Sequence, residues 1–235
     1  MRETARIALQ ATARASADHA GDDERNPYGS PFVPSRYAAD VRTEGPFRAL
    51  LDCDVVLGTT DDHSSRAILC DLAYAYGVPV IDVGVRAGAR AKALNALAAE
   101  VRVLTPTTPC LWCREVISAD VVREELLPPA QREKLRRERY LVGSTGQPEP
   151  SVVPLTVLGA GLATCALLAL VSPDGQDAPS GYLVDGFFGD ARPVGPTDPV
   201  DGCWCRTISW LGDDAPISWM SDATVNVDDS LATSR

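Results

Sequence analysis

Residues 54–84 carry a strand–helix–strand pattern that strongly restricts the fold. Asp54-Val-Val-Leu-Gly58 is short, β-branched and apolar without alternation, which is typical of a parallel strand covered on both faces. Apolar residues then recur at helical spacing from Ser64 to Tyr76, and Gly77 follows where a left-handed helix cap is favoured. A second apolar strand, 78–84, completes a unit with a right-handed crossover. The pattern predicts an α/β fold built on a mostly parallel sheet.

The same periodicities predict the other elements and one domain. We expect helices over residues 2–17, 46–51, 118–127, 155–171 and a charged helix ending at 140, and strands near 35–38, 101–104 and 182–184, the last paired with one near 191–194. Residues 143–150 are predicted to form a loop. The domain is predicted to cover residues 1–215, followed by a flexible acidic tail over 216–235.

Composition and charge exclude several classes of function. The formal net charge of −10 disfavours nucleic acid and anionic membranes as partners, because both would be repelled. The longest apolar run, 152–171, contains Pro154 and two threonines, which fits a buried helix better than a membrane span. The N-terminal residues lack the apolar core of a secretory signal, so we expect a cytoplasmic protein.

Two close cysteine pairs give the strongest chemical signal. Seven cysteines in a cytoplasmic chain indicate metal binding or buried thiols rather than a disulfide framework. Cys110 and Cys113 frame one tight turn, and Cys203 and Cys205 supply two more sulfurs, as a structural tetrahedral Zn²⁺ site requires. Two alternatives stay open: two unrelated pairs of reduced thiols, or a redox pair at Cys110 and Cys113.

Polar side chains are concentrated directly after the first strand of the unit, in Thr59-Thr-Asp-Asp-His-Ser-Ser65. Ligands collect at the carboxyl ends of parallel strands, where Asp61 or Asp62 could bind Mg²⁺ and the hydroxyls a ribose or phosphate. The alternative is that Asp62 or Ser64 only caps the following helix. His63 is expected to be an exposed loop residue. Gly159-Ala-Gly161 lies within an apolar helix and is expected to serve close packing rather than nucleotide binding.

Several of these segments together resemble one family. The segments are DVVLGTTDDHSSRAILCDLAYAYGVPVIDVGVR, TPTTPCLWCR, a charged region containing LLPP, the helix SVVPLTVLGAGLAT and the last cysteine pair. In this order they resemble the ThiF/MoeB/HesA family, bacterial relatives of ubiquitin-activating enzymes. The resemblance covers roughly residues 26–206, and its most specific parts are Thr60, Asp61 and Arg66 and the split cysteine site.

The resemblance implies a Rossmann-like homodimer with a zinc-braced C-terminal portion and a zinc-linked crossover segment over 105–150. It implies adenylation, with ATP and Mg²⁺, of the C-terminal carboxylate of a small ubiquitin-like carrier protein or peptide. By the same resemblance Asp61 is the catalytic Mg²⁺ and nucleotide aspartate, and Thr60, Asp62 and Arg66 complete the cofactor-binding pocket.

Two departures from the family pattern shape the expectation. The family's Gly-rich phosphate loop, acidic ribose-binding residue, Asn/Arg pair and Lys are not found, so the fold is expected to be N-terminally incomplete. A non-catalytic, zinc-stabilised binding or scaffold protein is the alternative. Residues 114–164 contain no cysteine, so we expect an activated product to leave as the adenylate to an external acceptor rather than as an enzyme thioester.

Overall fold

The structure is a computed structural model that describes residues 7–10, 38–90, 93–138, 153–172, 180–193 and 198–216. The predicted strand near 35–38, apart from Ala38, lies outside these ranges. The predicted loop over 143–150 and the tail beyond residue 216 lie outside them as well.

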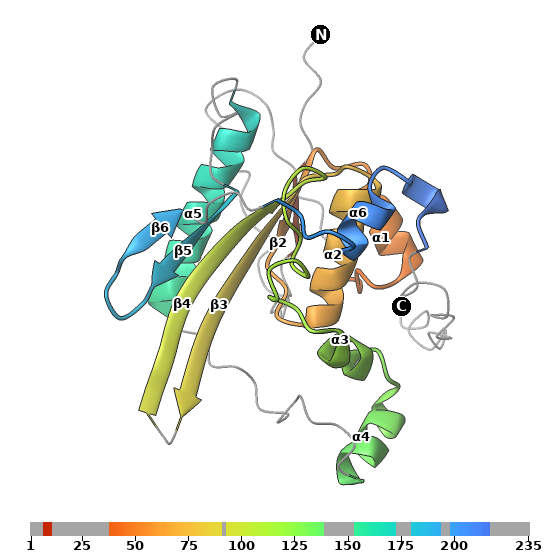
Figure 1. Ribbon diagram of the computed structural model, residues 1–235, viewed down its shortest axis with the longest axis horizontal. Coiled ribbons are helices and arrows are strands. Elements are labelled where there is room, and N and C mark those ends of the chain that lie inside the picture. Colours follow the sequence, from red (N-terminus) through yellow and green to blue (C-terminus); the bar gives the residue numbers. More distant parts are fainter. Residues whose placement is uncertain are drawn as a thin grey trace, which may run out of the picture.

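A single mixed sheet of six strands organises the described residues (Figure 1). Its strands follow one another in chain order: β1 (Ile7–Gln10), β2 (Val55–Gly58), β3 (Val80–Arg90), β4 (Ala93–Leu104), β5 (Gly181–Asp185) and β6 (Ala191–Pro193). The helices are α1 (Glu44–Leu50), α2 (His63–Ala75), α3 (Ala119–Glu125), α4 (Pro129–Arg137), α5 (Val153–Val171) and α6 (Trp204–Ile208), followed by the 3₁₀ turn η2 (Gly212–Asp214).

The sheet is parallel at one side only. Strands β1, β2 and β3 are parallel, with α2 as the crossover between β2 and β3, as the sequence predicts. Strands β3 to β6 are antiparallel to their neighbours, so the expectation of a mostly parallel sheet is wrong. The physical reason lies in the connections: only residues 91 and 92 separate β3 from β4, too few for the crossover that a parallel pair needs.

Two further expectations about strands are corrected. Residues 7–10 form strand β1 rather than part of a helix over 2–17. The reason is that their backbone N–H and C=O groups pair with strand β2, and this long-range pairing outweighs the local helix propensity from which the helix was predicted. Strands β3 and β4 are eleven and twelve residues long, far beyond the predicted 78–84 and 101–104. Their added residues are rich in Ala, Gly and Arg, which carry little β-propensity, and their cross-strand pairing supplies the stability.

The two faces of the sheet carry different layers (Figure 1). Helix α5 packs on one face, where Ala163 and Ala166 form a core with Val55, Ile81 and Val101. Gly159 lies against this face, with an added Cβ falling 3.3 Å from Val83 Cγ1, which confirms its expected packing role.

Helices α1, α2 and α6 lie on the other face, over a larger core that includes Phe47, Val56, Val80 and Leu104. Each fully buried side chain of this kind contributes about 1.5–3 kcal/mol. These contacts fix the position of α2, on whose two ends the candidate sites lie.

Helix α2 has the predicted ends to within one residue. Its last turn closes with the Tyr76 amide on the Leu72 carbonyl, and Gly77 follows at a φ of 72°. A side chain at Gly77 would also collide with the ring of Trp210, so both conformation and packing require glycine there.

Helix α5 is long and apolar enough to cross a membrane by length and composition alone. In this structure it packs against the sheet through Leu155, Gly159, Ala163 and Ala166, while most of its other residues are exposed. The expected buried helix is therefore buried on one side only, the side that contacts the sheet.

Candidate functional site

The four paired cysteines come together at one place, as their spacing predicts. Their sulfur atoms all lie within 4.8 Å of one another. The Sγ–Sγ distances are 3.5 Å for Cys110–Cys113 and 3.6 Å for both Cys110–Cys203 and Cys113–Cys205. Tetrahedral Zn²⁺ with Zn–S bonds of about 2.3 Å separates sulfurs by about 3.8 Å, whereas a disulfide holds them about 2.05 Å apart. The cluster therefore fits a four-sulfur metal site and not two unrelated thiol pairs.

Local structure explains how the unequal spacings work. Cys110 and Cys113 share a turn in which the Cys113 amide donates to Cys110 Sγ at 3.3 Å. Cys203 is the extended residue before α6 and Cys205 lies in its first turn, so one intervening residue suffices to bring both sulfurs to the same side. The Val200 amide also donates to Cys113 Sγ, at 3.4 Å. Such amide bonds stabilise thiolates and orient metal ligands.

The thiols of this cluster differ in pKa. Hydrogen bonding from Cys110, together with the other two thiols, lowers the pKa of Cys205 to about 6. Burial raises the pKa of Cys203 to about 11, and the hydrogen bond to Cys205 followed by burial raises the pKa of Cys110. Binding of Zn²⁺ by four sulfurs requires that all of them be deprotonated, so metal binding should release protons.

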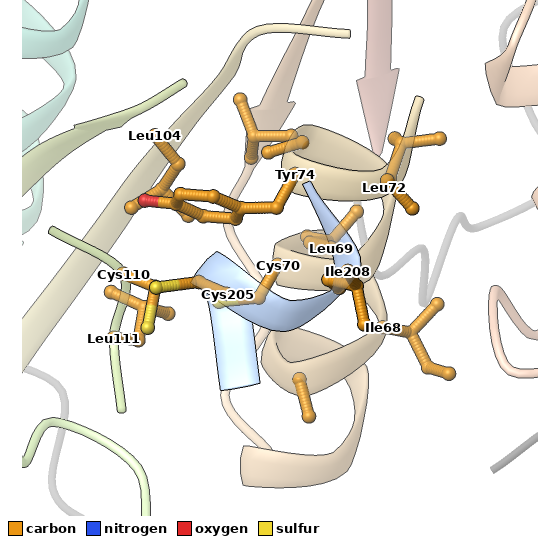
Figure 2. Close-up of a cluster of buried hydrophobic side chains, with 14 of the residues drawn as sticks. Ile68, Leu69, Cys70, Leu72, Tyr74, Leu104, Cys110, Leu111, Cys205 and Ile208 are labelled. Carbon is orange, nitrogen blue, oxygen red and sulfur yellow. The ribbon is translucent and has the colours of Figure 1, made fainter. Parts of the chain in front are cut away.

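The cluster is joined to the C-terminal half of α2 (Figure 2). Tyr74 donates its hydroxyl to the Thr108 carbonyl at 2.8 Å, before the first cysteine pair. Trp204, between the second pair, donates Nε1–H to Asp71 Oδ1 at 3.1 Å. The Trp210 amide donates to the Tyr74 carbonyl at 2.9 Å. Four sulfurs around one ion would thus tie β4, α2 and α6 into one core.

The polar segment after β2 divides into residues with different environments. Asp62 caps α2: Oδ1 accepts from the Ser65 amide at 2.6 Å and the Ser64 hydroxyl at 2.7 Å, and Oδ2 accepts from the Ser65 hydroxyl at 2.8 Å. Burial acts to raise the pKa of Asp62, but these bonds outweigh it and the pKa is lowered. Asp62 thus has the capping role that the sequence left open as an alternative.

Asp61 and Thr60 differ from Asp62. Asp61 is exposed at the carboxyl end of β2, so its carboxylate is accessible to a cation. Thr60 is only 6 % exposed, and its buried Oγ1 has no hydrogen-bond partner among the described residues. Of the predicted site residues, Asp61 and Thr60 have side-chain oxygens that make no hydrogen bond in the described part of the structure.

Arg66 is held inside the fold by a partner that sequence reasoning missed. Its Nε and Nη2 donate side-on to the two carboxylate oxygens of Asp82, at 2.9 and 2.5 Å. Asp82 lies in β3 and is 1 % exposed, and the Arg66 side chain is 12 % exposed. Burial acts to lower the pKa of Arg66, but the Asp82 charge and hydrogen bonds outweigh it. The only sequence signal for this pair is a carboxylate interrupting the apolar strand at 78–84.

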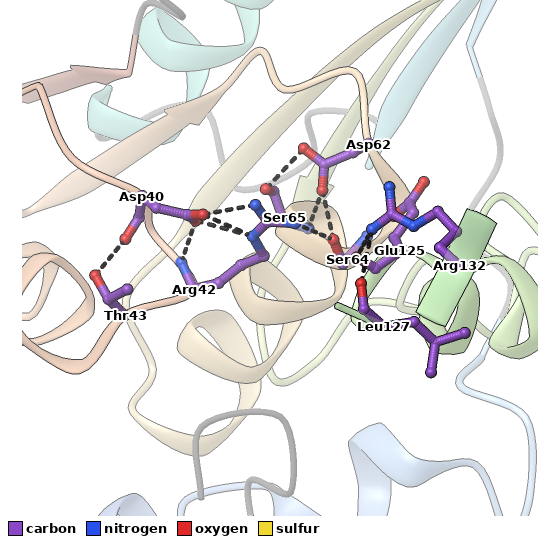
Figure 3. Close-up of polar contacts among 9 residues, drawn as sticks. All are labelled: Asp40, Arg42, Thr43, Asp62, Ser64, Ser65, Glu125, Leu127 and Arg132. Atoms are coloured by element: carbon purple, nitrogen blue, oxygen red, sulfur yellow. Dashed lines mark hydrogen bonds and ion pairs between the residues drawn. The ribbon is translucent and has the colours of Figure 1, made fainter. Parts of the chain in front are cut away.

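Two more residues that the sequence did not indicate lie at the N-terminus of α2 (Figure 3). Glu125 Oε2, from α3, accepts the Ser64 amide at 2.7 Å. Arg42 donates Nη1–H to the Ser64 hydroxyl at 3.1 Å. The two α2 amides at positions 64 and 65 are therefore bonded to the protein's own carboxylates, those of Glu125 and Asp62.

The surrounding helices hold Glu125 in place. Arg132 of α4 donates to the main-chain carbonyls of Glu124 at 3.1 Å and Leu127 at 3.2 Å, and to that of Glu125. His63 Nδ1 accepts the Ser118 amide at 3.0 Å. His63 is half-buried as the first residue of α2, so its expected place in an exposed loop is wrong.

Comparisons with known proteins do not name a family. No protein-family model matches the chain, and a search of curated proteins finds no significant match.

Proposed function

We propose that the protein is a zinc-braced adenylating enzyme of the ThiF/MoeB/HesA type, which activates the C-terminal carboxylate of a ubiquitin-like carrier protein or peptide with ATP and Mg²⁺. The observation that carries the proposal is Asp61: an exposed carboxylate at the carboxyl end of β2, in the parallel part of the sheet. That is where ligands of open α/β sheets bind. The parallel β1–β2–β3 group with its crossover α2 supports a Rossmann-like half.

The metal in the cysteine cluster is proposed to be structural zinc. Four sulfurs complete the tetrahedral shell, which leaves no open position for a substrate or a reactive water. A cycling redox pair is disfavoured, because Cys110 and Cys113 share the cluster with two further sulfurs. Reduced, metal-binding thiols agree with a cytoplasmic location.

Few of the described residues would bind Mg²⁺ and ATP directly. Mg²⁺ takes one or two protein carboxylates together with phosphate oxygens, and it would neutralise charge on the transferring phosphate. The exposed Asp61 fits this need, with the buried Thr60 hydroxyl beside it in sequence. Asp62 and Arg66 would act indirectly, the first by capping α2 and the second by fixing β3 against α2.

The net charge and the exposed side of α5 indicate which kinds of partner the protein binds. A net charge of −10 argues against nucleic acid and anionic membrane. The outer side of α5 is uncharged, with Val157 67 % and Leu168 61 % exposed, which supports the expected homodimer by a self-complementary contact.

A specific observation favours the alternative, a zinc-stabilised scaffold that binds a carrier without catalysis. Glu125 and Asp62 bond the Ser64 and Ser65 amides, which are donors that a phosphate group would otherwise use. A protein in this arrangement could retain the fold and a protein partner without binding nucleotide.

ATP–pyrophosphate exchange separates the two. Zinc-loaded protein is assayed with Mg²⁺·ATP, labelled pyrophosphate and a panel of ubiquitin-like carriers ending in Gly-Gly. The enzyme proposal expects carrier-dependent exchange that is lost in Asp61→Asn and kept in Asp120→Asn, a matched exposed carboxylate on α3. Carrier binding without exchange or ATP binding would support the scaffold instead. A thiol-sensitive conjugate on any cysteine would contradict release as the adenylate.

A further inference from the structure

A second cluster of charged side chains crosses the sheet on the α2 face, from Asp82, which pairs with the last residue of β2, toward β5. Asp82 of β3 and Arg102 of β4 are direct cross-strand partners, and Gly181 of β5 pairs with Arg102 in turn. Because paired residues share a face, Arg102 lies on the side from which Arg66 of α2 reaches Asp82. Neither the proposed adenylation nor the metal site uses Arg102.

Arg102 is buried with donors that no described residue accepts. The residue is 8 % exposed, and its one hydrogen bond is from Nη2 to Glu100 Oε2 at 3.3 Å. Its Nε–H and Nη1–H groups are buried without partners. A guanidinium stays charged at any physiological pH, so burying it with unpaired donors is strongly unfavourable unless an anion accepts them.

A second guanidinium lies beside the same strand. Arg114, directly after Cys113, donates Nη2–H to the Ser180 hydroxyl at 3.1 Å and Nε–H to the Pro109 carbonyl at 3.3 Å. Ser180 precedes Gly181, the β5 partner of Arg102. An added Cβ at Gly181 would lie 3.3 Å from Arg102 Cδ, so glycine lets the Arg102 side chain lie against β5 at the residue next to this serine.

The charges around these side chains do not balance among the described residues. Arg66 is paired with Asp82 and Arg102 with Glu100, whereas the bonds of Arg114 go to the Pro109 carbonyl and the Ser180 hydroxyl rather than to a carboxylate. This is a local positive excess in a chain whose net charge is −10. Two planar guanidinium groups and a hydroxyl form a donor set that suits an oxyanion and offers nothing to a cation.

We propose that Arg102, Arg114 and Ser180 form a binding site for a small oxyanion, the phosphate or carboxylate group of a ligand. The site is separate from Asp61 and does not depend on adenylation. Because Arg114 is adjacent to the metal ligand Cys113, the metal cluster fixes one wall of this site.

Isothermal titration calorimetry with inorganic phosphate, and separately with acetate, tests the proposal on the zinc-loaded full chain at ionic strength held constant with KCl. Thermal unfolding is followed at the same anion concentrations. We expect saturable binding and a rise in Tm with at least one anion. Arg102→Met and Arg114→Met should each weaken it about ten-fold or more. Arg123→Met removes an arginine that is 75 % exposed on α3 and should bind like the wild type.

The outcomes discriminate the source of the anion and the role of Arg102. A response to phosphate alone identifies a phosphate group, and a response to acetate alone identifies a carboxylate. If Arg102→Met does not fold, Arg102→Lys keeps the charge but loses the planar fork, and it too should bind more weakly. No saturable response to either anion, or an unchanged response in the Arg102 variants, would overturn the proposal.

Discussion

The Arg66–Asp82 ion pair provides a quantitative test of how the fold holds the β2–α2 edge. Asp82→Asn keeps the size of the side chain but removes its charge, and it leaves the Arg66 guanidinium, 12 % exposed, without its hydrogen-bonded carboxylate. Breaking a buried pair in this way costs about 3–5 kcal/mol. The whole domain is stabilised by about 5–15 kcal/mol, so this one substitution should remove a large share of it.

The expected size of the effect can be followed in two measurements. Urea unfolding monitored by circular dichroism at pH 7 should give the loss of about 3–5 kcal/mol directly. The Tm of a chain of this length should fall by about 10 °C, since each kcal/mol shifts it by about 2–4 °C.

A double variant makes the reasoning refutable. Arg66→Met together with Asp82→Leu replaces both charges by apolar groups, which should recover most of the loss because no charge is left unpaired. A change of less than about 1 kcal/mol in Asp82→Asn would show that solvent or a rearrangement compensates the pair. A double variant as unstable as the single one would show that packing, and not the unpaired charge, dominates.

Three further predictions test the metal site, the helix cap and the outer face of α5. One zinc per chain should copurify, and chelation should lower the Tm, because four-sulfur binding energy is also folding energy; metal analysis and a thermal melt decide this. Asp62→Ala should cost about 1 kcal/mol at pH 7. Because the pKa of Asp62 is lowered by folding, this cost should shrink as pH falls below the unfolded value of about 3.9, measured by urea melts across pH. The proposed homodimer should be a monomer in light scattering after Val157→Glu with Leu168→Glu. In the wild type, Cys165, which is exposed on the same helix, should form an intermolecular disulfide when a chemical oxidant of thiols is added in vitro to accept the two electrons.

Sequence reasoning succeeded where local patterns decide the structure. The helix predicted over 64–76 is α2 at 63–75, and the one over 155–171 is α5 at 153–171, since helical periodicity is a property of neighbours. The β3–β4 hairpin was not predicted, because its Ala- and Gly-rich residues depend on pairing across strands rather than on propensity. The antiparallel half of the sheet follows from that single missed connection.

The residues of the candidate sites also fall into those that local patterns predict and those that long-range contacts determine. The four cysteines were predictable because a thiolate cluster has few other uses, and spacing alone brings each pair together. Which carboxylate neutralises Arg66, and which one accepts the Ser64 amide, depends on tertiary contacts. Asp82 and Glu125 are 16 and 61 residues from their partners, a separation that no local pattern encodes.

The contacts at the start of α2 constrain how an anion could bind there. The helix dipole favours one negative group at this end, by about 0.3–1 kcal/mol, and two carboxylates already occupy its amides. A phosphate at the same amides would have to displace Glu125 and would meet the charge of Asp62. A metal ion on Asp61 would instead be attracted by these carboxylates, against the opposing charge of Arg42 at the same end of α2. For the proposed nucleotide binding at this edge, we therefore expect a metal ion at Asp61, rather than the amides of α2, to hold the phosphates.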